Sequence, residues 1–177
     1  VVKLNKAKNC TMDRIMCYHG INNFLTSLGE RKCKVYLLHG YMNNDEIHSL
    51  YCDPKIKALL SLSHGEGFGL PLFEAAYCGK PIITHDWGGQ TDFLEVTTET
   101  KTGKKKQKAF YAKVDYDLAP IQQTAVWDGV LQADSQWAYP KEQSAKNVMR
   151  KVYKNYDVYK GVAKKLQKII HKNFQPE

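Results

Sequence analysis

Residues 63–83 of the chain have the sequence SHGEGFGLPLFEAAYCGKPII, in which a glycine-rich stretch precedes a helix-forming one. Gly67 and Gly69 free the backbone to approach a ligand closely. Pro71 suits the first turn of a helix and Gly79 its end, so the sequence predicts a helix between them. Such a helix directs unpaired amides and the positive end of its dipole at the preceding loop. The stretch therefore predicts an anion-binding loop.

Strands and helices alternate in the prediction on both sides of this loop. Apolar runs predict strands, and three- and four-residue apolar spacings predict helices, with turn residues between them. The predicted strands are residues 1–4, 34–39, 56–62 and 81–84, and the predicted helices are 11–28, 44–51 and 71–79. This alternation implies right-handed crossovers and a parallel sheet covered on both faces. The predicted fold is α/β with a doubly wound parallel sheet, whose ligands lie at the carboxyl ends of strands.

Two helices on the amino-terminal side are predicted in more detail. The helix at 11–28 carries an apolar stripe and ends at Gly29, which makes it amphipathic. The stripe consists of Ile15, Ile21, Phe24, Leu25 and Leu28. Asn44 is expected to cap the short helix that follows the second strand, because asparagine is a favoured capping residue.

Beyond Glu95 the sequence changes character. A lysine-rich stretch at 101–108, flanked by β-favouring residues, predicts an exposed hairpin or loop over about 97–114. Helical spacing returns in the last third and predicts helices within about 141–173. The chain is expected to form one domain over residues 1–177, with its core at about 1–95.

Composition limits the classes of function. The 177 residues, 43% of them hydrophobic, are enough for one sizeable core. The chain has 26 Lys and Arg against 18 Asp and Glu, a net charge of +8 that favours partners carrying phosphate. No apolar run approaches the ~18 residues of a membrane span, and no signal region is present, so a soluble protein is expected.

The cysteines and histidines predict neither a disulfide scaffold nor a metal site. The five cysteines form no CxxC pair, and the six histidines are scattered between predicted elements. Reduced, mostly buried thiols are typical of a cytoplasmic protein, which is the expected location. His64 and His85 follow predicted strands, where a structural role is expected rather than acid–base catalysis.

Two carboxylates bracket the glycine-rich loop. Glu66 lies within it, and Glu74 follows eight positions later, roughly one turn into the helix. Carboxylates accept hydrogen bonds from hydroxyl groups, whereas the loop amides suit phosphate. A sugar nucleotide, with phosphates at its centre and a polyol at each end, satisfies all of these groups together.

In these residues the sequence resembles the retaining glycosyltransferases of family 4, whose donor domain carries a Glu-x7-Glu element in a setting like EGFGLPxxEA. The resemblance extends to Gly40 with residues 44–51, to GKPII at 79–83 and to Gly88 with Gly89. It covers roughly residues 1–94. It implies a Rossmann-like domain forming the carboxyl-terminal half of a GT-B fold.

The resemblance also implies site residues. Glu74 holds the ribose hydroxyls, and Glu66 is the catalytic-site carboxylate that faces the transferred sugar. The donor-binding loop comprises Gly67, Phe68, Gly69 and Leu70, the last three through amides that contact sugar or diphosphate. Tyr41, Met42 and Asn43 lie near the base, and Lys3 supplies part of the positive charge that the diphosphate requires.

The implied activity is transfer of a hexose from a UDP- or GDP-sugar to an unknown acceptor with retention, without cofactor or metal. The family also uses an amino-terminal acceptor-binding domain, which these residues do not provide. The abrupt opening strand suggests that the chain starts inside a domain. The chain alone is therefore expected to bind the donor weakly and to transfer nothing.

Two other classes of function compete with this reading. A dinucleotide-binding oxidoreductase domain fits Gly65-x-Gly67 and Asp86, but Leu70 stands where its third glycine belongs. A nucleic-acid-binding module fits the lysine run at 101–108 with Phe110, Tyr111 and Tyr116. Nucleic acid is not expected to be an obligatory partner, and the sequence leaves membrane association open.

Overall fold

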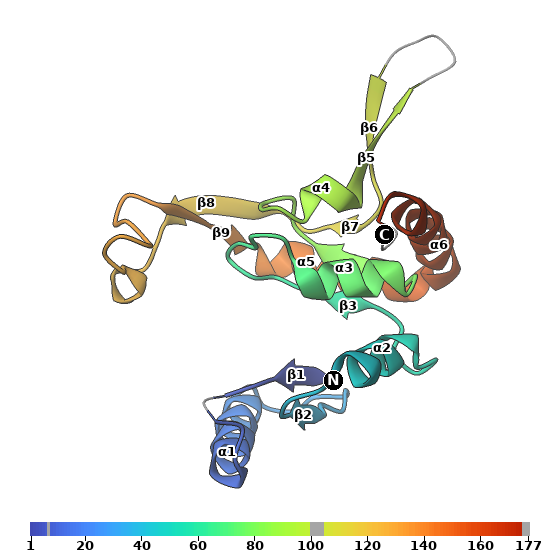
Figure 1. Cartoon of the computed structure of the whole chain (residues 1–177). Coiled ribbons are helices and arrows are strands. Elements are labelled where there is room, and N and C mark those ends of the chain that lie inside the picture. The colour runs from blue at the N-terminus through green and yellow to red at the C-terminus, as the bar shows by residue number, and fades with distance from the viewer. Residues whose placement is uncertain (7, 100–104, 175–177) are drawn as a thin grey trace. The chain divides into compact units, whose positions relative to one another are not determined.

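The computed structural model describes residues 1–6, 8–99 and 105–174 (Figure 1). Residue contacts divide the chain into two compact units, Val1–Ile47 and His48–Glu177. In the first unit, β1 (Val2–Leu4) and β2 (Leu37–His39) pair in parallel and are connected through α1 (Thr11–Ser27). This unit confirms the predicted strand, helix and strand, the second strand being shorter than predicted.

Helix α1 is present as predicted, but its apolar stripe is not buried within the first unit. None of its residues is buried, and Phe24 is 63% exposed. The first turn of the helix contains Asp13, whose carboxylate accepts hydrogen bonds from Lys8 N and Cys10 N at 3.1 and 3.2 Å. The side-chain hydrogen bond from Cys10 is the largest cause that lowers the pKa of Asp13.

Helix α2 (Asn44–Cys52) is capped by Asn43 and not by Asn44. Glu46 N donates to Asn43 Oδ1 at 2.9 Å, and Asn43 N donates to Glu46 Oε2 at 2.8 Å. This reciprocal pair is a capping box. The prediction of Asn44 was wrong because two adjacent asparagines compete for the cap and Glu46 stands three residues after the first.

The second unit is built on a parallel sheet in the order β3-β4-β7, formed by Leu59–Leu60, Ile82–Thr84 and Ala112–Lys113. Helix α3 (Leu70–Tyr77) crosses from β3 to β4. It ends as predicted at Gly79, whose φ of 67° is left-handed, and Lys80 N bonds back to Ala75 O at 2.9 Å.

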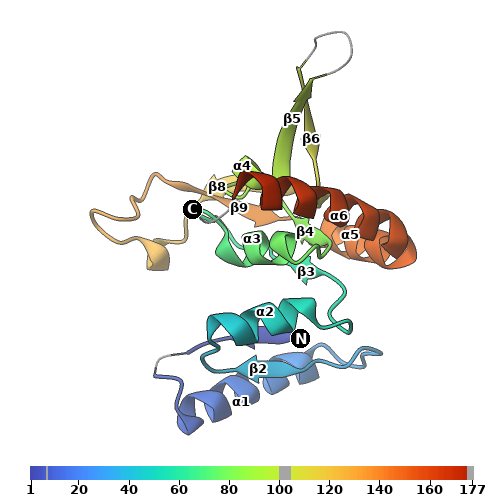
Figure 2. The ribbon, with the colours of Figure 1, turned by 45° about the vertical axis from the view of Figure 1, so that its right-hand side comes forward.

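The carboxyl-terminal helices α5 (Glu142–Lys154) and α6 (Tyr156–Asn173) complete the second unit (Figure 2). Buried residues of α5 pack with Ile83, Ala112 and Val114 of the sheet region. Helix α6 contacts α3, and its Gln167 Nε2 donates to Tyr77 O at 2.7 Å. Both helices confirm the prediction of helices at about 141–173.

Two antiparallel ribbons also belong to the second unit. After the short α4 (Thr91–Leu94), β5 (Glu95–Glu99) pairs with β6 (Lys105–Ala109), and Figure 1 shows this ribbon extending away from the parallel sheet. It confirms the predicted hairpin, although 101–104 of the lysine run lie outside the described residues. The second ribbon, β8 (Tyr116–Pro120) with β9 (Gln136–Pro140), encloses a short 3-10 helix at Gln123–Ala125 and was not predicted.

The described part of the chain is thus mixed α/β with parallel strands in small sheets, which is consistent with a Rossmann-like domain. Its described strands are hydrogen-bonded in four separate sheets, so one continuous doubly wound sheet stays a prediction. The single-domain organisation also stays a prediction. Within the described ranges, no helix has the length and apolarity to cross a bilayer.

Candidate functional site

The glycine-rich loop follows β3 and leads directly into α3. Gly69 stands at the N-cap with a left-handed φ of 83° and offers no side chain to the first helical amides. The first bond of the helix runs from Phe73 N to Gly69 O at 3.0 Å. Pro71 has no N–H, so the amides of Leu70 and Leu72 are the groups that the helix leaves for a ligand. This confirms the geometry that the sequence predicted for the loop.

A second pair of glycines, Gly88 and Gly89, lies in the turn that contacts the loop. Gly89 N donates to Glu66 O at 2.9 Å. A Cβ at Gly89 would lie 1.8 Å from Gly67 O, and one at Gly88 would lie 2.8 Å from Glu66 O. Both positions exclude a side chain, so at these two glycines the loop and the turn meet through their backbones.

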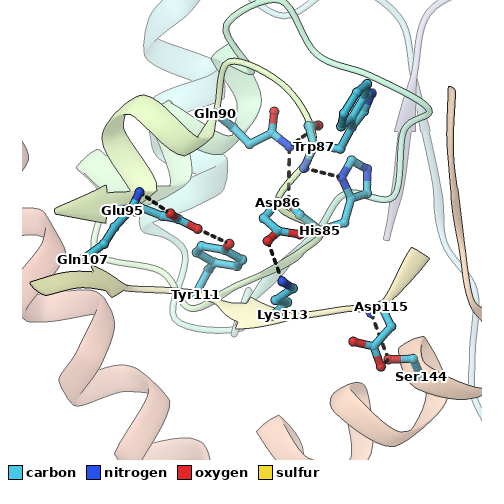
Figure 3. Close-up of polar contacts among 10 residues, drawn as sticks. All are labelled: His85, Asp86, Trp87, Gln90, Glu95, Gln107, Tyr111, Lys113, Asp115 and Ser144. Carbon is cyan, nitrogen blue, oxygen red and sulfur yellow. Dashed lines mark hydrogen bonds and ion pairs between the residues drawn. The ribbon is translucent and has the colours of Figure 1, made fainter. Parts of the chain in front are cut away.

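Buried polar side chains hold this turn in place. Gln90 is fully buried, and its Nε2 donates to Trp87 O at 2.9 Å and to His85 O at 3.3 Å (Figure 3). His85 is also fully buried: its Nδ1 accepts from Trp87 N at 3.1 Å, and its Nε2 lies 2.6 Å from Ser63 O. The bond from Trp87 N fixes the tautomer, because Nδ1 must be unprotonated to accept and Nε2 then carries the donated proton.

His64 has a structural position as well. Its Nδ1 lies 2.8 Å from Ala138 O on β9, and Ala138 N returns a bond of 3.0 Å to His64 O. Its ring stacks on Trp137, with centroids 4.9 Å apart and planes inclined by 1°. Both loop histidines thus connect elements of the second unit, as expected of structural residues.

Glu66 and Glu74 are half-buried, and neither side chain has a hydrogen-bond partner among the described residues. Burial raises the pKa of the Glu74 carboxyl. Tyr51 on α2 lies near Glu74: burial and then the charge of Glu74 raise the pKa of Tyr51 to about 12. Both half-buried carboxylates, which no described residue hydrogen-bonds, are available to accept hydrogen bonds from a ligand.

Phe68 and Leu70 lie on the outer side of the loop, 46% and 57% exposed. The Phe68 ring packs against Phe73 and Phe93, with centroids 5.4 and 5.2 Å away. The structure therefore brings six of the predicted residues into one loop-and-helix segment: Glu66, Gly67, Phe68, Gly69, Leu70 and Glu74.

The other four predicted residues belong to the first unit. Lys3 Nζ donates to Gly40 O at 2.6 Å and to Asn5 Oδ1 at 2.8 Å, so its ammonium has local partners. Asn43 caps α2 through its side chain, Met42 is half-buried, and Tyr41 is 77% exposed. Their donor-binding role stays a prediction.

Sequence reasoning missed an ion pair at the carboxyl ends of β4 and β7. Lys113 Nζ lies 2.5 Å from Asp86 Oδ2 (Figure 3), and this hydrogen bond is the main cause that raises the pKa of Lys113. Asp86 is the residue that a dinucleotide-binding domain would use on the ribose. Its engagement by Lys113 leaves it poorly placed for that role.

Glu95 was also missed, and it fixes the base of the β5–β6 ribbon. It accepts hydrogen bonds of 2.6 Å from both Tyr111 Oη and Gln107 Nε2 (Figure 3). Burial is the main cause that raises the pKa of Tyr111, so its hydroxyl stays protonated and donates. The alternation of Tyr111, just before β7, with Lys113 in β7 was the available sequence signal.

Comparison with known proteins adds one finding. Residues 32–115 match the family model described as Glycosyl transferases group 1. No significant match was found among curated proteins or among solved structures. The matched segment contains the glycine-rich loop, both carboxylates and the β3-β4-β7 sheet, and it supports a role in glycosyl transfer.

Proposed function

We propose that the chain is the donor-binding part of a retaining glycosyltransferase that transfers a hexose from a UDP- or GDP-sugar. One observation carries the proposal: two half-buried carboxylates, which no described residue hydrogen-bonds, flank a helix start without a side-chain cap, inside the segment that matches group 1 glycosyl transferases. Amides suit phosphate and carboxylates suit hydroxyls, so a sugar nucleotide matches the whole set.

Each group has a proposed task. The amides at the start of α3, together with its dipole, stabilise the negative charge that develops on the leaving diphosphate. Glu74 accepts hydrogen bonds from the ribose hydroxyls, and Glu66 faces the transferred sugar. No metal is assigned to this reaction, because the fixed amides supply the charge stabilisation.

The proposed enzyme also needs an acceptor-binding domain, which the family resemblance implies and which we propose as a partner. The chain by itself is then expected to bind the donor weakly and to transfer no sugar. Efficient glycosylation of an acceptor by the purified chain would contradict this part of the proposal.

Calorimetric titration with UDP-glucose, GDP-mannose, UDP, GDP and NAD tests the donor site. Replacing Glu74 by alanine should weaken binding of the preferred nucleotide by about 1–3 kcal/mol, because hydroxyl groups lose their acceptor. Glu142→Ala is the matched control, since it removes an exposed carboxylate of α5 that pairs with Lys146. That variant should bind like the parent.

The dinucleotide-binding alternative predicts a different result. Binding of NAD alone, or nucleotide binding that is equal in the parent and Glu74→Ala, would overturn the donor-site proposal. Selective binding of one base that weakens only in Glu74→Ala would support it and would identify the base.

A further inference from the structure

Three side chains that bind soft metals meet between α2 and the end of α3. His48 and Cys52 lie one helical turn apart on α2, and Cys78 follows the last residue of α3. Cys52 Sγ lies 3.4 Å from His48 Nε2 and 3.9 Å from Cys78 Sγ, and Cys78 Sγ lies 3.6 Å from His48 Nδ1. One ligand atom from each residue lies within 4.8 Å of the others.

These separations match those between ligands of a tetrahedral zinc ion. Zinc takes sulfur at about 2.3 Å and imidazole nitrogen at about 2.0–2.1 Å, which places two sulfurs about 3.8 Å apart and sulfur about 3.6 Å from nitrogen. The sulfurs here are 3.9 Å apart, and Cys52 Sγ and Cys78 Sγ lie 3.4 and 3.6 Å from the two different ring nitrogens of His48. One ion binds one nitrogen of an imidazole, so a rotation of the His48 ring that brings one nitrogen near both sulfurs would complete the ligand set, whose atoms already lie within 4.8 Å of one another.

The backbone that carries the ligands is held together independently of them. Lys80, two residues after Cys78, donates from Nζ to Asp53 O at 2.9 Å and to Ile56 O at 2.8 Å. These carbonyls belong to the turn that follows Cys52. The end of α2 and the end of α3 are thus fixed to each other before any ion binds.

We propose that His48, Cys52 and Cys78 bind one zinc ion, with a water molecule as the fourth ligand. His48 and Cys52 are exposed, which leaves a path for the ion and room for the water. Both thiols lose their protons to solvent when the ion binds, because thiolate is the ligand form. The ion cross-links α2 to the end of α3, so its role is structural.

No metal site was predicted from the sequence, because the cysteines form no CxxC pair and the histidines are scattered between predicted elements. Cys52 and Cys78 are 26 positions apart, and only the fold brings them together. The pair His48 and Cys52, four positions apart on a helix, was the available signal.

Cobalt and zinc titrations of the reduced full chain test the site. Cobalt should give the intense visible bands of a tetrahedral ion with a thiolate-to-cobalt charge-transfer band, and one equivalent of zinc should displace it. Cys52→Ser and Cys78→Ser should each weaken zinc binding more than about 100-fold in competition with a chromophoric chelator. Even outer-shell changes cost about 10–100-fold, and these variants remove a ligand.

Cys33→Ser is the matched control, because it removes an exposed free thiol of the first unit. It should leave the cobalt spectrum and the zinc affinity unchanged. Far-ultraviolet circular dichroism checks that each variant is folded. A cobalt spectrum without a thiolate band, or zinc binding equal in the parent and the Cys52→Ser, Cys78→Ser double variant, would overturn the proposal. These readouts do not involve a nucleotide, so they are independent of the proposed transferase function.

Discussion

At the scale of single residues, the contact between Gly67 and Gly89 sets the position of the loop. Because a Cβ at position 89 would meet Gly67 O at 1.8 Å, Gly89→Ala must push the loop away from its support. We expect this variant to lose about 1–3 kcal/mol of unfolding free energy in urea, as overpacked sites do. Gly65→Ala is the control in the same loop, since its Cβ would meet nothing within 4 Å. Equal stabilities of the two variants would contradict the contact.

Glu74 gives a prediction about pH. Burial raises its pKa above the usual 4.5, so the folded state binds this proton more tightly than the unfolded state. The resulting stabilisation is complete below pH 4.5 and is lost as the pH rises through the folded pKa. Glu74→Gln cannot titrate, so it should gain stability relative to the parent as the pH rises from about 4 to 7. Urea unfolding at a series of pH values, with a chelator present, measures the difference.

Glu142 provides a control in which the pKa shift, and therefore the pH dependence of stability, has the opposite sign. The hydrogen bond from Lys146 lowers the pKa of Glu142, so its contribution is present at neutral pH and is lost as the pH falls. Glu142→Gln should therefore lose stability relative to the parent as the pH rises, although the pair is exposed and the effect small. The same trend in both glutamine variants would contradict the assignment of burial as the cause at Glu74.

At the scale of elements, α6 is the helix that secures α3. Gln167 and His171 both contact Tyr77 O at the end of α3, and Leu166 and Ile170 are fully buried. The start of α3 can face a ligand while its far end is held by α6.

Leu166→Ala should therefore cost about 2–5 kcal/mol of unfolding free energy, from lost burial and the cavity that remains. Val158, on the same helix and 65% exposed, offers the control: Val158→Ala should stay within about 0.5 kcal/mol of the parent. A small loss in Leu166→Ala would mean that α6 contributes little to the core, and urea unfolding distinguishes these results.

Elements with strong local signals were predictable, and those made by distant pairing were not. Pro71 and Gly79 delimit α3, and apolar spacing indicates α1 and α6. The strand β7 has only two residues, and the strands β8 and β9 are separated by 15 residues at 121–135 without a clear turn signal. Pairing across such a separation depends on the whole fold, which a local pattern does not contain.

In the candidate site as well, local features could be predicted and features made by distant segments could not. The loop and its two carboxylates could be predicted from the sequence because they lie within one short segment. Two other features could not be predicted, because each depends on segments that folding brings together. They are the side chains that support the loop, His85 and Gln90, and the cluster of His48, Cys52 and Cys78. The apolar stripe of α1 was predicted from its spacing, yet the first unit does not bury it.

At the scale of the whole molecule, burial is uneven. Among the described residues, every buried hydrophobic side chain belongs to the second unit, from Tyr51 to Ile170. Denaturant unfolding of the chain should accordingly report on the second unit, which carries the loop, both carboxylates and the proposed zinc ligands.

The supports of the glycine-rich loop are directed at main-chain atoms: His85 contacts Ser63 O and Trp87 N, and Gln90 contacts Trp87 O. Peptide groups are the same whatever side chain a residue carries. Exchanging a side chain of the loop at a position that does not need glycine therefore leaves these hydrogen bonds in place. The ligand that such a loop recognises can therefore change during evolution while the hydrogen bonds that hold the loop stay the same.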